Sequence, residues 1–426
     1  MRKFTLLTAV IAGAYLSAQN RPIITRWKTS SDQDKRIAIN NEGKGTYTFE
    51  KVGDPSKSGN GDLLGESKVI INLPEPGEYI VKITPNGKFS LKMGFTTEEE
   101  ASELLELSQW GDVKWGYDAS VSSMFTNCKN LTITATDIPD FSRVEDMSNM
   151  FYKCFSLTNI PNINSWNVSN VTDMSNMFGY ADKFNADNLN NWDTSKVQNM
   201  TLMFAGYKTS IFNGDISKWD TSNVRYMDKM FRDNDKFNQD ISKWNTSKVL
   251  SFEQMFRNAK SFDQNLGTWT IKSSSLTKMF DDSAMSCLNY SKTLKGWAEN
   301  KNTTNNVTLS AVNIKYGNAG KSFRDILTSQ KGWNITGDIH DSQCNVNLSV
   351  SEYAKNDDIN IENPIKDVLK IFSKNPIISA KIYTINGELI KSFSKSEISV
   401  TNLDKGVYLL IVNTSIGSKT IKVIKD

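Results

Sequence analysis

Few side chains in this 426-residue sequence have the types and spacing that catalysis or metal binding requires. His340 is the single histidine, so general-base catalysis, a Ser–His or Cys–His nucleophile and a histidine metal site lose their usual residue. The cysteines form no Cys-x-x-Cys pair, which argues against zinc. A glycosidase needs two carboxyl groups about 5–10 Å apart in a cleft, and the sequence indicates no such pair. We therefore expect no enzyme activity, no cofactor and no metal site.

Opposite charges recur at equivalent positions of a repeated segment. Asp215 lies three residues before Lys218, and Asp240 lies three residues before Lys243. These side chains could bind a partner, although a solvated face accounts for them as well. The segment Asn213-Gly214-Asp215 and its counterparts also offer oxygen ligands for calcium. They lack the glycine-rich nonapeptide of calcium-binding β-rolls, so turn-forming Asn and Asp residues are the preferred interpretation.

A Met-Phe pair recurs with a period near 26 residues. Its methionines lie at 124, 150, 177, 203, 230, 255 and 279, with spacings of 26, 27, 26, 27, 25 and 24. The aromatic residues that recur in phase are Trp166, Trp192, Trp219, Trp244 and Trp269, with Phe151, Phe178, Phe204, Phe231 and Phe256. Stacked repeats must pack a side chain at the same core position in each copy. This recurrence therefore favours buried core residues over an exposed platform that stacks on carbohydrate.

One repeat predicts a short strand followed by a short helix. Val224, Met227 and Met230 are spaced as on one helix face, and Phe231 continues it. Serines precede this face at Ser169, Ser195, Ser222 and Ser247, where they could cap the helix. The upstream segment 216–219 indicates a brief strand. The predicted fold class is therefore an α+β repeat solenoid, resembling leucine-rich repeats, with one strand and one helix in each coil of about 26 residues.

The repeated pattern Trp-Asp/Asn-Thr/Val-Ser-Asn/Lys-Val-x-x-Met-x-x-Met-Phe carries a family resemblance. It resembles the BspA-like leucine-rich-repeat surface proteins, also described as the domain of unknown function of mycoplasma lipoproteins. Phe125-x-x-Cys128-x-x-Leu131 is similar to the core of Treponema-type leucine-rich repeats. The resemblance covers about residues 104–342 and implies a surface adhesin that binds a host or microbial protein or glycan. Met, Phe and Trp largely replace Leu, so no particular ligand transfers.

Four cysteines leave room for two disulfides. Cys128 and Cys154 occupy the same place in consecutive repeats, at a separation that a disulfide accepts. Related repeats use this cysteine as a small buried side chain, so both roles stay open. Cys287 and Cys344 bracket the segment after the repeats and would staple it.

The remaining segments suggest export. Arg2 and Lys3 precede an apolar run of about eleven residues at 6–16, which predicts a signal peptide too short to span a membrane. The net charge of +3 indicates no nucleic-acid partner.

The predicted parts are a signal peptide at 1–18, a small β domain at 19–95, the solenoid at 96–286, its cap at 287–344, a linker at 345–360 and a C-terminal β-sandwich at 361–426.

The C-terminal segment carries a second resemblance. Asn363-Pro364-x-x-Asp367, then Ile382-Tyr383-x-x-x-Gly387 and Leu403-x-x-Gly406-Val407-Tyr408, are similar to a type A sorting domain of the type IX secretion system. This resemblance implies that the type IX machinery is a partner, in a member of the Bacteroidetes. It also implies an extracellular or outer-membrane-surface location, often after removal of the domain.

Together these patterns suggest a secreted, surface-attached binding protein or adhesin. The alternative is a glycan-binding or glycan-processing accessory protein of the cell surface. A structural spacer without a ligand is a third hypothesis. Repeat surfaces vary independently of their scaffold, so the ligand, the binding face and the oligomeric state do not follow from the sequence.

Overall fold

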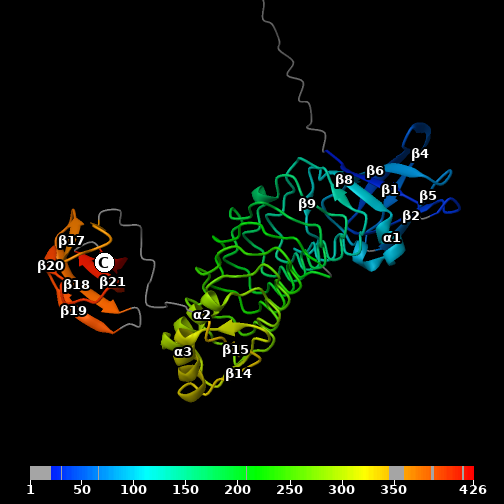
Figure 1. The fold of residues 1–426 in the computed structure, drawn as a ribbon. Coiled ribbons are helices and arrows are strands. Elements are labelled where there is room, and N and C mark those ends of the chain that lie inside the picture. Colours follow the sequence, from blue (N-terminus) through cyan, green and yellow to red (C-terminus); the bar gives the residue numbers. More distant parts are fainter. Residues whose placement is uncertain are drawn as a thin grey trace, which may run out of the picture. The chain divides into compact units, whose positions relative to one another are not determined.

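The computed structural model describes residues 21–344, except 30, 66 and 208, and residues 359–426, except 385–387 and 415–416. The chain forms two compact units, Met1–Val346 and Asn347–Asp426 (Figure 1). Each unit has its own hydrophobic core. The predicted signal peptide and most of the predicted linker lie outside the described residues.

The first unit begins with two sheets. Its elements are β1 (Ile23–Lys28), β2 (Arg36–Glu42), β3 (Gly45–Lys51), β4 (Asp54–Leu63), β5 (Ser67–Asn72), β6 (Glu78–Pro85), β7 (Lys88–Leu91), η1 (Met93–Phe95), α1 (Glu98–Ser102), β8 (Leu104–Gln109), β9 (Lys114–Trp115) and β10 (Thr132–Ile133). The sheet orders are β10-β8-β1-β6-β3-β4 and β5-β2-β7-β9. Because β8 pairs antiparallel with β1 and parallel with β10, the first sheet continues past residue 95 into the repeats.

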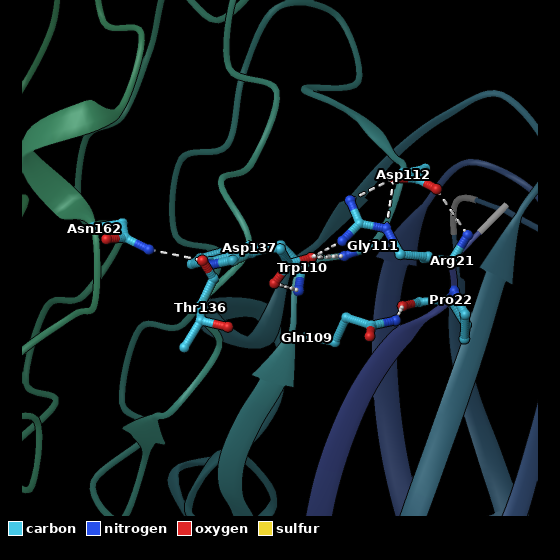
Figure 2. Close-up of polar contacts among 9 residues, drawn as sticks. All are labelled: Arg21, Pro22, Gln109, Trp110, Gly111, Asp112, Thr136, Asp137 and Asn162. Atoms are coloured by element: carbon cyan, nitrogen blue, oxygen red, sulfur yellow. Dashed lines mark hydrogen bonds and ion pairs between the residues drawn. The ribbon is translucent and has the colours of Figure 1, made fainter.

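A polar cluster fixes this junction (Figure 2). The Asp137 carboxylate accepts hydrogen bonds from the backbone N–H groups of Trp110 and Gly111, at 3.0 and 2.9 Å. Arg21 donates to Asp112 through Nε and Nη2, at 2.9 and 2.7 Å, and its Nη1 lies 3.8 Å from Asp137. The Trp110 ring, held in this way, packs edge-on against four other aromatic rings and closes the N-terminal end of the repeat core.

The predicted fold class, an α+β repeat solenoid with a strand and a helix in each coil, is wrong. The regular secondary structure is mostly β-strand, in several small sheets, and about 9% of the chain is helical. Between β10 and α2 (Cys287–Glu299), the described residues contain only the 3-10 helix η2 (Ile163–Ser165) and the two-residue strand β11 (Ser275–Leu276). The residues between them lie in turns, bends and isolated bridges.

Left-handed residues explain why the predicted helices do not form. The residue before the Met of each Met-Phe pair has positive φ: Ser123, Asn149, Asn176, Leu202, Lys229, Gln254 and Lys278. A second such residue follows the Phe by two positions in most repeats: Asn127, Lys153, Tyr180, Asp233, Asn258 and Asp282. A left-handed residue interrupts a right-handed helix. The apolar spacing that predicted one helix face is therefore produced by successive turns, whose Met and Phe side chains are buried.

The repeats are joined by a ladder of backbone hydrogen bonds. The Phe N–H of each Met-Phe pair donates to the Met carbonyl oxygen of the next pair, from Phe125 to Met150 through to Phe256 and Met279, at 2.8–3.1 Å. Isolated parallel bridges connect the equivalent residues Asp146, Asp173, Asn199, Tyr226 and Ser251. The strand predicted at 216–219 is wrong, because that segment contains a turn and the isolated bridges lie outside it, at Asp215 and Tyr226.

The serines predicted to cap helices lie in Asx turns instead. The Ser222 N–H donates to Asp220 Oδ1 at 2.9 Å. The same contact is made by Ser169 with Asn167, by Ser195 with Asp193 and by Ser247 with Asn245. The Asp or Asn after each Trp therefore fixes the turn that leads to the buried Val.

Aromatic columns fill the core of the repeats. The rings of Trp166, Trp192, Trp219, Trp244 and Trp269 stack with centroids 6.0–6.4 Å apart. Those of Phe151, Phe178, Phe204, Phe231 and Phe256 stack at 5.4–6.0 Å. Burying one Trp and one Phe contributes roughly 8–12 kcal/mol per repeat, whereas two left-handed residues cost about 2–4 kcal/mol. The packing thus outweighs the backbone strain.

The far end of the first unit contains its two longer helices. After α2 come β12 (Thr308–Ser310), β13 (Lys315–Tyr316), α3 (Asn318–Ser329), β14 (Asn334–Thr336) and β15 (Ile339–His340). Trp297 of α2 stacks on Phe280 with centroids 6.1 Å apart and covers the last repeat. Cys287 and Cys344 form a disulfide with Cα atoms 6.4 Å apart, which ties the start of α2 to the end of this segment.

Cys128 and Cys154 are buried free thiols. The Cys154 thiol lies 3.1 Å from the Phe125 carbonyl oxygen and donates to it, so it is directed at the backbone of the preceding repeat. Burial raises the pKa of both thiols. The sequence left two roles open for these cysteines, a disulfide and small buried side chains. In the structure they are small buried side chains.

The second unit consists of two antiparallel sheets. Its strands are β16 (Ile359–Ile361), β17 (Val368–Ser373), β18 (Ile377–Thr384), β19 (Leu389–Phe393), β20 (Glu397–Ser399), β21 (Gly406–Thr414) and β22 (Gly417–Lys425). The sheet orders are β16-β17-β20 and β19-β18-β21-β22. Residues of both sheets, including Leu369, Ile382 and Leu410, pack in one core.

Replacing Lys229 by glycine tests the left-handed turns. Glycine adopts the observed φ of 57° without steric cost. Lys229→Gly should therefore raise the free energy of unfolding by up to about 1 kcal/mol, whereas glycine inside a helix would lower it by about 1 kcal/mol. Denaturant unfolding followed by tryptophan fluorescence gives the sign. Lys243→Gly, at an exposed lysine outside the left-handed set, is the control and should destabilise; equal destabilisation by both would contradict the turn.

Candidate binding surfaces of the repeats

The charged residues selected from the sequence do not come together as a site. Asp215 Oδ1 accepts from the Ser217 N–H at 3.0 Å, and Asp240 Oδ1 accepts from the Ser242 N–H at 2.9 Å. The hydrogen bonds from Ser217 lower the pKa of Asp215. Lys218 and its counterpart Lys243 are exposed, and the described residues give neither an ion pair. The carboxylates hold turns, while the lysines face solvent.

The Asn and Asp residues considered for calcium form a hydrogen-bonded ladder. Asn213 Oδ1 accepts from the Asn238 N–H at 3.0 Å, and Asn238 Oδ1 accepts from the Asp263 N–H at 2.8 Å. Asn213 Oδ1 also accepts from Gln239 Nε2 at 3.1 Å, and Asn238 Oδ1 from Gln264 Nε2 at 2.9 Å. These oxygens therefore bind donors of the neighbouring repeat. Among the described residues, no group of His, Cys, Asp or Glu is arranged to hold a metal ion.

The tryptophan column offers no surface to a sugar. Trp192, Trp219, Trp244 and Trp269 are at most 4% exposed. Their Nε1 atoms donate to backbone carbonyl oxygens of the preceding repeat at 2.8–3.2 Å, those of Ile163, Leu189, Ile216 and Ile241. The column is part of the core, since its rings stack on one another and the Nε1 atoms of these four tryptophans have internal partners.

A second set of aromatic residues does lie at the surface. This aromatic patch consists of Tyr152, Phe155, Tyr180 and Tyr207. Ring centroids are 5.2 Å apart for Tyr152 and Tyr180, 5.6 Å for Tyr180 and Tyr207, and 5.9 Å for Phe155 and Tyr207. Tyr207 is 56% exposed, and the Tyr180 hydroxyl lies 3.5 Å from Arg232 Nη2. The patch combines ring faces, hydroxyl groups and a guanidinium group.

Sequence reasoning missed this patch because its tyrosines keep no fixed phase. Tyr152 follows the Phe of its repeat by one residue, Tyr180 by two and Tyr207 by three. A search for a constant period therefore passes over them, although they meet in space.

A basic groove crosses four consecutive repeats. It has a volume of about 380 Å³ and is lined by Thr172, Lys196, Gln198, Asn223, Arg225 and Lys248. Its sequence signal is Ser-Lys-Val at 195–197 and 247–249, where the other repeats have Ser-Asn-Val at 169–171 and 222–224. The two lysines thus occupy the same place in alternate repeats.

Comparison with protein families matches both units. A family model described as "Mycoplasma protein of unknown function, DUF285" matches residues 119–210 and 186–297. The repeats are similar to this family. Another, described as "Secretion system C-terminal sorting domain", matches residues 363–426. No curated protein matches the chain.

The second match confirms the sorting-domain interpretation of the sequence and indicates a secreted surface protein handled by the type IX secretion machinery. It corresponds to the strands β17 to β22, which form most of the second unit. Over the described residues, no helix combines the length and the apolar character needed to cross a bilayer.

Calcium should leave the stability of the protein unchanged, because the ladder oxygens already accept hydrogen bonds from the chain. Adding or chelating calcium should not move the midpoint of thermal unfolding. Asn238→Ala removes an acceptor of two donors and should lower the free energy of unfolding by about 1–3 kcal/mol. Asn238→Asp keeps the oxygen atom and is the matched control. A calcium-dependent rise in the midpoint would overturn this account of the ladder.

Proposed function

We propose that this chain is a secreted, cell-surface-attached and non-enzymatic binding protein, an adhesin whose repeats contact a protein on another cell or matrix. The aromatic patch, exposed at Tyr207 and half-buried at its other three rings, is the observation that carries this proposal. Most aromatic side chains of the repeats are buried, so these four rings are not needed to fill the core. Tyr and Arg are enriched among residues that dominate protein interfaces, and this patch places both together.

The chemistry of the patch suits a macromolecular partner. Tyrosine offers a large contact area with few rotatable bonds and a hydroxyl group that can pair at an interface. The Lys153 ammonium lies 5.5 Å from the centre of the Tyr152 ring, and Arg232 lies beside Tyr180. A partner could thus cover apolar ring faces beside two cations. These cations also pair within the chain, Lys153 with Glu98 and Arg232 with Asp233.

Surface attachment is supported by the two ends of the chain. The sorting-domain match supports export across an outer membrane, and the N-terminal signal pattern in the sequence supports entry into that route. The resemblance to BspA-like leucine-rich-repeat proteins supports adhesion. A source in the Bacteroidetes stays a prediction from the sorting-domain resemblance.

The alternative, a glycan-binding accessory protein, loses its main sequence argument because the tryptophans are buried. The basic groove is the one observation that favours it. Glycan processing has no comparable support, since the groove is lined by no carboxylate that could act as a general acid.

Fractionation of the native organism tests the location. Immunoblots with separate antibodies against the repeats and the C-terminal domain should find the repeats on intact cells or in the medium, without residues after about 345. A periplasmic full-length protein would contradict surface attachment. Deletion of residues 363–426 should block export and serves as the control.

Substitutions in the aromatic patch test the binding role. Tyr180→Ser combined with Tyr207→Ser should weaken saturable binding of the purified protein to cells or matrix by about tenfold or more, because buried tyrosines are typical interface hot spots. Phe95→Ser is the matched control, since Phe95 is 69% exposed and lies outside the repeats. Thermal unfolding verifies that both variants fold. Unsaturable binding by the unmodified protein would support a structural spacer instead.

A further inference from the structure

The cations of the basic groove form no direct ion pair with a carboxylate among the described residues. Other arginines of the first unit, such as Arg21, Arg26 and Arg324, bind Asp or Glu within 2.9 Å. Arg225 has no such partner among the described residues, and neither has Lys196 or Lys248. With a net charge of only +3 over the whole chain, three cations without a direct ion pair in one groove are a local concentration of positive charge.

Neutral amides orient the two lysines. Lys196 Nζ donates to Asn170 Oδ1 at 2.6 Å, and Lys248 Nζ donates to Asn223 Oδ1 at 2.6 Å. Each ammonium has three donors, so two remain for a ligand. The same Lys–Asn contact is thus built twice, in alternate repeats, and each amide holds its ammonium without neutralising it.

The acidic residues near the groove in the sequence are already engaged. Asp173 accepts from the Ser175 N–H and from Asn199 Nδ2, and Asp228 accepts from the Glu253 N–H. Asp193 Oδ1 accepts from the Ser195 N–H at 3.1 Å, and Asp220 Oδ1 accepts from the Ser222 N–H at 2.9 Å. Their carboxylates hold the Asx turns and do not line the groove. The hydrogen bonds from Ser195, with a smaller contribution from the charge of Lys196, lower the pKa of Asp193. An anionic ligand would therefore meet amides, a hydroxyl group and cations.

The dimensions of the groove exclude a simple anion as its complete ligand. Parallel bridges connect neighbouring repeats, so equivalent residues are ~4.8 Å apart per repeat and Lys196 and Lys248 are about 10 Å apart. One sulfate or phosphate cannot reach both ammonium groups. The spacing instead suits a chain with negative charges at intervals, lying along the repeats.

The side chains that line the groove favour a glycan over a peptide as its ligand. Its six side chains are polar or charged, and none is apolar. Protein partners usually insert an aromatic or aliphatic anchor into a pocket, which this groove does not offer. Amide and hydroxyl groups beside cations match a ligand that carries hydroxyl groups between its charges.

We propose that the basic groove binds a linear anionic glycan, whose sulfate or carboxylate groups pair with Lys196, Arg225 and Lys248. The hydroxyl groups of its sugars hydrogen-bond to Gln198 and Asn223. This inference rests on the proposed binding function and specifies a class of ligand for a surface separate in residues from the aromatic patch.

The test uses the full chain without its signal peptide and a heparin-derived sulfated oligosaccharide as the probe, at about 150 mM salt. The variant Lys196→Gln combined with Lys248→Gln should lose at least tenfold in affinity, and adding Arg225→Gln should abolish binding. Lys218→Gln combined with Lys243→Gln removes the same charge from exposed lysines and should change affinity less than twofold. Thermal unfolding midpoints establish that all variants fold.

Further probes distinguish the alternatives. Polygalacturonate should bind at the same site, whereas dextran, which is neutral, and inorganic sulfate should not compete. Equal losses in both lysine pairs would show an unspecific charge effect and overturn the proposal. Stronger binding of polyglutamate, lost in the same variant, would overturn it in favour of an acidic protein partner. If the unmodified protein adheres to cells but binds no anionic glycan, the groove inference fails while the proposed function stands.

Discussion

The structure depends on hydrogen bonds between neighbouring repeats. The repeats contain almost no regular helix or sheet, and the turn hydrogen bonds within one repeat, such as that from the Met230 N–H to the Met227 carbonyl oxygen, satisfy only part of the backbone. Unpaired buried backbone groups are costly, and each repeat therefore uses the N–H and C=O groups of the next. The Phe N–H to Met carbonyl ladder fixes the register, and the buried rings stack because of that register. Both ends then need covers, which are the β8 and β10 sheet with Trp110 and, at the other end, α2 with Trp297.

The core could be predicted from the sequence, but the local backbone could not. Trp219 and Phe231 recur at a fixed phase, and the structure buries both. The spacing of Val224, Met227 and Met230 is equally compatible with a helix and with successive turns. The deciding residue is Lys229, which has positive φ. The residue type does not reveal this conformation, because the equivalent positions hold Ser, Asn, Leu, Gln and Lys.

The binding surfaces, like the local backbone, could not be predicted from the sequence. Asp215 and Lys218 drew attention because they recur in adjacent repeats, yet the structure uses the carboxylate for a turn. Residues that meet in space without regular recurrence were missed: the tyrosines drift in phase, and Lys196 alternates with asparagine. Periodicity identifies what the stack requires in every copy. Binding surfaces arise where copies differ, so they need coordinates to be found.

The alternation of lysine and asparagine has a consequence for how such a gene can change. Lys196 and Lys248 are separated by two complete repeats, and each repeat brings its own donors, acceptors and core side chains. An in-frame duplication of two repeats would add two copies that make the same contacts as the existing ones. It would also place a third lysine in line with the others. Unequal recombination could thus lengthen the row of lysines by one with each such duplication, whereas duplication of a single repeat would disturb the alternation.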